Sequence, residues 1–83
     1  MYLISMFLTI ATAGKQLFAG SVYGVTCPGT EGELTVLGHH EPTITVLKKG
    51  TISVLKEKNG TREDFPIEHG LLEVSGNKAV ILL

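Results

Sequence analysis

Residues 26–50 read Thr26-Cys-Pro-Gly-Thr-Glu-Gly-Glu-Leu-Thr-Val-Leu-Gly-His-His-Glu-Pro-Thr-Ile-Thr-Val-Leu-Lys-Lys-Gly50 and concentrate turn-forming residues around two short apolar runs. Proline presets φ and glycine allows φ above zero, so Pro28-Gly29 predicts a turn. The apolar runs at 34–37 and 43–47 predict two short strands. A polar corner at 38–42 joins them, and we expect this corner to be either a structural pivot or a contact surface.

Apolar and polar residues also alternate with a period of two in the part of the chain that precedes this run. The alternation predicts a first strand at 7–11, a turn at 13–15 and a second strand at 17–25. Within the second strand the alternation of apolar and polar residues is interrupted. Gly20 and Gly24 therefore predict a bulge or a bend there.

The part of the chain that follows contains Asn59-Gly60, the strongest short-range signal for a hairpin. Because both residues tolerate φ above zero, the dipeptide predicts a two-residue type I′ turn between strands at 51–58 and 61–67. Pro66 lacks an N–H donor, so the second of these strands is predicted to lie at an edge or to be bulged.

Glycines divide the rest of the chain into short strands. Gly50 and Gly70 predict turns, and Gly70 leads into a strand at 71–74, in which Leu72 and Val74 are predicted to face the core. A further turn at 75–77 leads into the last run, 78–83. Residues 79–83 of this run are apolar on both sides, so we expect them to be covered on both faces.

No window has the periodicity of a helix, and turn signals recur at intervals of roughly 8–12 residues, which is typical of an all-β sandwich or barrel. We expect about 8–10 short antiparallel strands. A length of 83 residues fits a single domain, here taken as residues 1–83.

Composition excludes several classes of function. The net charge is −1 and the only basic doublet is Lys48-Lys49, whereas nucleic-acid binding requires a basic stripe. Cys27 is the single cysteine, so no internal disulfide forms. The apolar residues 1–11 are far short of the roughly 20 needed to span a bilayer, so we expect membrane association only through another protein.

Two clusters invite a chemical interpretation. His39-His40-Glu41 resembles part of a metal site, but adjacent residues of an extended chain point to opposite faces, and nothing in the spacing brings His69 near them. Glu31 and Glu33 resemble an acid–base pair, but their glycine-flanked loop offers neither burial nor a positive neighbour. We expect both clusters to be solvated loops or partner contacts, with no catalytic, metal or cofactor role.

Several motifs in order make the chain similar to a known family. They are Pro28-Gly-Thr-Glu-Gly-Glu33, Leu37-x-x-His40-x-Pro42, Ile44-Thr45, Leu47-Lys-x-Gly50 and Gly70-Leu-Leu-Glu-Val-Ser-Gly-Asn-Lys78. Together they resemble the amino-terminal domain of the epsilon subunit of rotary (F-type) ATP synthases, over residues 8–83. The chain departs from the family pattern at Gly38 and His39, where proline and glycine are usual.

The resemblance implies a flattened β-sandwich in the central stalk of a proton-translocating ATP synthase. It implies that the chain links the gamma shaft to the membrane c-ring, within a complex that contains the catalytic alpha and beta subunits. It also implies a non-catalytic, peripheral subunit at the cytoplasmic face of the bacterial inner membrane. The loops expected to face the c-ring contain Glu31, Gly32, Glu33, His40 and Glu41. Since the family's carboxyl-terminal helical hairpin has no counterpart here, we expect a short form without it.

The alternative is an unrelated small β-domain that binds a ligand or a metal through its loops, with a pocket near His39 and His40. An enzyme is the third and weakest hypothesis. The stalk hypothesis predicts an exposed apolar sheet face that a gamma subunit covers, whereas a deep polar pocket would oppose it.

Overall fold

The structure, a computed structural model, describes residues 5–38 and 40–83, and within them the chain is built of strands joined by short turns. The all-β prediction is confirmed. No helix long and apolar enough to cross a membrane occurs in these residues. The nine strands are β1 (Met6–Thr12), β2 (Lys15–Val22), β3 (Gly24–Gly29), β4 (Gly32–Leu37), β5 (His40–Leu47), β6 (Gly50–Leu55), β7 (Arg62–Ile67), β8 (Gly70–Gly76) and β9 (Lys78–Leu82).

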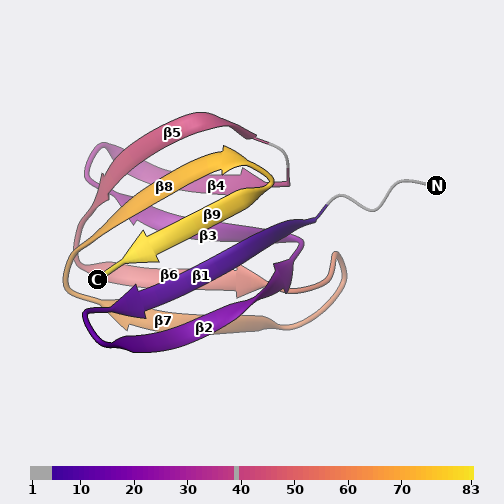
Figure 1. Ribbon diagram of the computed structural model, residues 1–83, viewed down its shortest axis with the longest axis horizontal. Helices are drawn as coiled ribbons and strands as arrows, with labels where there is room; N and C mark the ends of the chain where they lie inside the picture. The colour runs from indigo at the N-terminus through magenta and orange to yellow at the C-terminus, as the bar shows by residue number, and fades with distance from the viewer. Residues whose placement is uncertain (1–4, 39) are drawn as a thin grey trace.

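The strands form one sheet in the order β2-β1-β9-β8-β5-β3-β6-β7, with β4 paired to the remaining edge of β3. The sheet curls (Figure 1), so that β2-β1-β9-β8-β5 and β4-β3-β6-β7 form two halves around one core. The halves join where Gly29 of β3 meets Leu47 of β5. Neighbouring strands are antiparallel except β1 and β9, which run parallel, a pairing the sequence did not indicate.

The core lies between the two halves, because alternate side chains of each strand point inward. Leu72 and Val74 are fully buried as predicted, while Glu73 between them is exposed. Each such buried aliphatic side chain stabilises the fold by roughly 1.5–3 kcal/mol. The other buried apolar residues are Met6, Leu8, Ile10, Val22, Val25, Cys27, Val36, Leu47, Ile52, Val54, Ile67, Ala79 and Ile81.

The strand predicted at 17–25 is not continuous, because the chain bends at Tyr23, beside Gly24 where a bulge or a bend was predicted, and divides into β2 and β3. The bend brings Gly24 against β4, where a Cβ atom would lie 2.6 Å from Leu37 Cδ2. The bulge is at Leu17 rather than Gly20. Ile10 pairs with Phe18 and Ala11 pairs with Gln16, so Leu17 is the extra residue on β2.

The turn predicted at Pro28-Gly29 is also wrong, since both residues belong to β3 and the chain turns at Thr30 and Glu31. Gly32 supplies the left-handed conformation, with φ +127°. Gly29 is needed for a close approach instead, because a Cβ atom there would lie 2.7 Å from the Gly32 carbonyl oxygen. The turn predicted at Gly50 lies earlier in the chain: Gly50 begins β6, and the turn before it consists of Lys48 and Lys49.

The two-residue hairpin at Asn59-Gly60 is replaced by a longer connection, because the β6–β7 ladder already closes at Leu55 and Arg62. A tertiary contact competes with the hairpin: the Tyr23 N–H donates to the carbonyls of Leu55 (2.9 Å) and Lys56 (3.1 Å). At the tip, the Gly60 N–H donates to the Glu57 carbonyl instead.

The polar corner at 38–42 is shorter than predicted, since β5 already begins at His40. Its ladder with β8 pairs His40 with Gly76 and Thr43 with Val74, so one residue is left over as a bulge. Pro42 lies in this bulge, where its missing N–H interrupts no regular pairing. Pro66 is on β7, which is the last strand of the order, so its predicted edge position is confirmed.

Candidate partner interface

The outer side of the β1-β9-β8-β5 half carries exposed apolar side chains. We call Phe7, Ile44, Val46, Leu71 and Leu82 the apolar face. Ile44 is 70% exposed, Val46 56% and Leu82 52%. The ladders place Leu82 beside Leu71 and Leu71 beside Val46, so three neighbouring strands contribute to one continuous row. The prediction that the last run is covered on both sides is therefore wrong for the chain alone.

The apolar face follows from apolar residues at outward positions of strands whose inward positions already fill the core. On β8, Leu71 faces out and Leu72 faces in. On β9, Ile81 is buried and Leu82 is exposed. On the same surface Ile44 lies beside Glu73 and Phe7 beside Lys78, so the continuous apolar part is the row of Val46, Leu71 and Leu82. An exposed apolar row of this kind is typical of a protein–protein interaction site.

The outer side of the β4-β3-β6-β7 half has a different chemistry. The Thr26 and Thr35 hydroxyls hydrogen-bond to each other across β3 and β4 at 3.0 Å. On the neighbouring strands the Arg62 guanidinium donates to Ser53 Oγ at 3.2 Å. Among the large exposed apolar side chains that the structure describes, only Leu37 belongs to this half. The two outer surfaces are thus chemically distinct, and one of them is suited to a partner.

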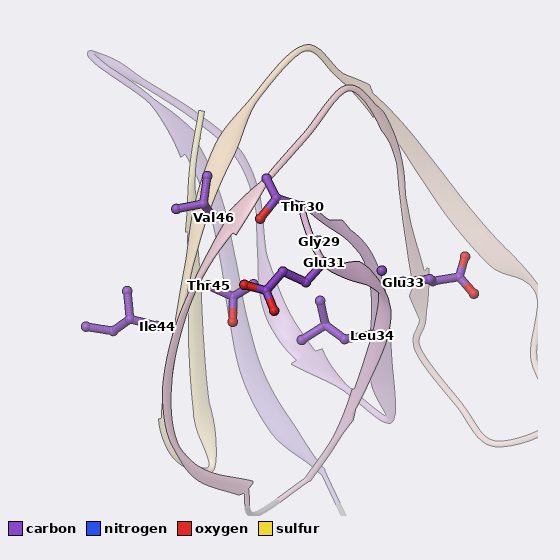
Figure 2. Close-up of a pocket in the computed structure, with 9 residues that line it drawn as sticks. Gly29, Thr30, Glu31, Glu33, Leu34, Ile44, Thr45 and Val46 are labelled. Atoms are coloured by element: carbon purple, nitrogen blue, oxygen red, sulfur yellow. The ribbon is translucent and has the colours of Figure 1, made fainter.

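An open pocket of about 530 Å³ lies where the β3–β4 turn meets β5. Figure 2 shows the Glu31 side chain reaching from this turn toward Thr45, whereas Glu33 points away on the other side of the turn. Ile44 and Val46 belong to both the pocket and the apolar face. The pocket is lined by Gly29, Thr30, Glu31, Gly32, Glu33, Leu34, Ile44, Thr45 and Val46.

The residues expected to face a c-ring do not form one cluster. Glu31, Gly32 and Glu33 are exposed at one end of β4, whereas His40 and Glu41 begin β5 beyond the other end of β4. Between the two groups β4 pairs, among the described strands, with β3 alone, so no described strand covers its outer edge. The two groups therefore flank one edge strand.

The structure offers little for the loop-binding alternative. Its described residues contain no group of three or more His, Cys, Asp or Glu side chains that could hold a metal. His39 lies outside the described residues. The open pocket is lined by residues 44–46 of β5, at the far end of that strand from His40. Cys27 is buried in the core, and this burial raises the pKa of its thiol to about 12.

The sequence predicts an apolar interface but does not indicate which residues form it. The signal was present in each strand as an apolar residue on both faces, as in Leu71-Leu72 and Ile81-Leu82. Which of these residues share a surface depends on pairing between distant strands, and this pairing was not evident from local pattern.

In residues 5–38 and 40–83 the fold consists of strands, and its exposed apolar outer face is typical of small modules that dock on another protein. The family model "ATP synthase, Delta/Epsilon chain, beta-sandwich domain" matches residues 5–83. The ATP synthase epsilon chain of Chlorobium limicola is 39% identical over 75 residues, which cover 90% of this chain and 84% of that one. The chain therefore belongs to the ATP synthase epsilon-chain family, and the resemblance seen in its motifs is confirmed.

Longer relatives match equally well. The ATP synthase epsilon chain of Dehalococcoides mccartyi is 41% identical over 76 residues, which cover 90% of this chain and 52% of that one. A chain in the cryo-EM structure of the Euglena gracilis mitochondrial ATP synthase with its c-ring has a TM-score of 0.86 at 25% identity. That match covers 94% of this chain and 49% of the Euglena chain, so the chain spans about half the length of these two relatives.

Proposed function

We propose that this chain is a central-stalk subunit of a proton-translocating rotary ATP synthase, where it links the gamma shaft to the membrane c-ring. In this proposal residues 1–83 act as one non-catalytic domain of an enzyme complex. The complex also contains the catalytic alpha and beta subunits. The domain would lie peripherally at the cytoplasmic face of a bacterial inner membrane.

The apolar face is the observation that supports the gamma contact most directly. Its side chains are between 38% (Leu71) and 70% (Ile44) exposed, whereas a folded domain of this size gains stability by burying such groups. A partner sheet or helix on this face would remove Ile44, Val46 and Leu82 from water. The polar hydroxyl-rich half would remain solvated.

The c-ring contact is proposed for the free edge of β4 and the turns that flank it. Glu31, Gly32 and Glu33 lie at one end of this edge and His40 and Glu41 at the other. An edge strand between these two polar segments can hold both against a large ring at once. In this arrangement the domain transmits torque through its contacts and makes no covalent bond.

Co-purification tests the proposal. The chain is tagged in its native cell, membranes are solubilised gently, and the bound proteins are identified. We expect gamma, the catalytic subunits and the c-ring to be recovered. Ile44→Asp should lose them, because it replaces the most exposed side chain of the apolar face with a charge. Thr51→Asp, on an exposed position of β6, is the matched control and should retain them. Recovery of the wild-type chain alone would refute the proposal.

A further inference from the structure

The outer edge of β4 presents backbone groups with which no described strand pairs. The ladder to β3 places Glu33 opposite Pro28, which has no N–H and whose carbonyl accepts from the Lys48 N–H at 2.9 Å on the other edge of β3. Glu33 and Pro28 therefore form a non-hydrogen-bonded pair, and the N–H and C=O of Glu33 point to the outer edge of β4. Because backbone direction alternates along a strand, the same groups of Thr35 and Leu37 also point there.

The two strands that end the hydrogen-bonded order, β2 and β7, are protected against the addition of a further strand. β2 has the bulge at Leu17, β7 contains Pro66, and the two strands meet through Phe18 and Phe65. Bulges, prolines and covering contacts are the devices by which proteins keep sheet edges from pairing. β4 has no proline, and its register with β3 is unbroken over residues 32–37. An edge of this kind is suited to take up an extended segment of another protein.

The two ends of this edge differ in chemistry. At the beginning of β4 the exposed Glu31 and Glu33 supply two negative charges, on either side of the turn (Figure 2). The pocket of about 530 Å³ lies at this end, between Leu34 of β4 and Thr45 of β5, and leaves room beside the edge for an incoming side chain. At the other end Leu37 is 44% exposed. Neighbouring strands favour opposite charges and apolar pairs side by side, so the edge fits a segment that is basic at one end and apolar at the other.

We propose that the edge of β4 takes up, as an additional strand, an extended segment of the subunit that faces it in the assembled complex. The backbone groups of Glu33, Thr35 and Leu37 bond to this segment. A lysine or arginine side chain of the segment meets the acidic turn, and an apolar side chain packs on Leu37. This inference rests on the proposed function and deepens it, because it states how a partner is held at the edge assigned to the ring contact.

Hydrogen exchange of the isolated chain and of the purified complex, resolved to single residues by mass spectrometry, tests the added strand. In the isolated chain the outward amides of Glu33, Thr35 and Leu37 should exchange rapidly, whereas those of Leu34 and Val36, which bond to β3, should exchange slowly. In the complex we expect the three outward amides to exchange at least about tenfold more slowly. Unchanged rapid exchange of these amides would overturn the added strand and leave the stalk function intact. A chain that co-purifies with no other subunit would instead refute the proposed function.

A proline at the centre of the edge distinguishes strand pairing from simple burial. Thr35→Pro removes an outward N–H and takes no hydrogen bond from the ladder to β3. Thr35→Ala is the matched control, because both variants lose the hydroxyl bond to Thr26 and only the proline variant loses the donor. In the complex, Thr35→Pro should return the Glu33 and Leu37 amides to rapid exchange, whereas Thr35→Ala should keep them slow.

Melting temperatures of the isolated variants show whether both fold. Leu37→Pro removes the last outward N–H of β4 and replaces Thr35→Pro if that variant is unstable, with the same expectation for Glu33 and Thr35. Slow exchange of the remaining outward amides in a folded proline variant would mean that a partner buries the edge without pairing to it, and the proposal would be wrong.

Discussion

Cys27 is the residue whose chemistry the fold changes most. It lies on β3 with no exposed surface, among aliphatic side chains of the core. Burial disfavours the thiolate and raises the pKa of the thiol from 9.0 to about 12. We expect the native protein at pH 8 to react with a thiol reagent such as DTNB only at the rate of unfolding. Rapid stoichiometric reaction of the folded chain would contradict this burial.

The raised pKa of Cys27 should also make the free energy of unfolding depend on pH in the alkaline range. A group whose pKa is raised by folding contributes stability that is fully present below the unfolded pKa and is lost as pH rises toward the folded pKa. The contribution of Cys27 to the free energy of unfolding should therefore fall between pH 9 and 12. Urea unfolding at several alkaline pH values measures this slope. Cys27→Ala is the control, because the part of the slope due to the thiol should be absent from it.

At the level of strands, the seam between β2 and β7 closes the curled sheet without backbone pairing, since these strands end the hydrogen-bonded order. Phe18 and Phe65 meet across the seam edge to face, with ring centroids 6.0 Å apart. Such a pair contributes about 0.5–1.5 kcal/mol beyond its burial. A double-mutant cycle of Phe18→Leu and Phe65→Leu, followed by urea unfolding, should give a coupling energy in this range. Strictly additive effects would show that the rings do not hold the seam.

The ion pair beside this seam provides a comparison. Lys56 Nζ lies 3.1 Å from Glu63 Oε1 and 5.6 Å from the centre of the Phe18 ring. Both side chains of the ion pair are about half exposed, so solvent and salt screen it. Glu63→Gln is therefore expected to change the free energy of unfolding by less than about 1 kcal/mol. The ion pair joins the β6–β7 connection to β7, so the contact across the seam is left to the aromatic rings.

The strands also show what local sequence can and cannot predict. The alternation of apolar and polar residues identified the inward positions of β8. The direction of the Leu72 and Val74 side chains depends only on the pleat of that one strand. Turn chemistry failed at Pro28-Gly29 and Asn59-Gly60, where contacts from elsewhere decide the conformation. Gly29 allows a close approach to Gly32, and Tyr23 binds the carbonyls that a tight hairpin would use.

The candidate interface was less predictable for a related reason. The motifs indicated the family and the acidic turn, and they suggested that an apolar face exists. The face itself is assembled from β1, β5, β8 and β9, whose order in the sheet differs from their order in the chain. Only this pairing brings Leu82, Leu71 and Val46 into one row. The opposite directions of Glu31 and Glu33 likewise depend on how the turn meets β5.

At the level of the whole molecule, the thin core and the apolar face predict that partner binding stabilises the fold. A ligand that binds only the folded state lowers the unfolded fraction by the factor 1 + [L]/Kd, about 100-fold when the partner is present at roughly 100 times its Kd. Core amides on β8 exchange through global unfolding, so gamma should slow their hydrogen exchange by about this factor. Mass spectrometry of peptides from this chain measures the effect separately from gamma. Ile44→Asp should show no slowing at the same gamma concentration, and equal slowing in that variant would mean that gamma binds elsewhere.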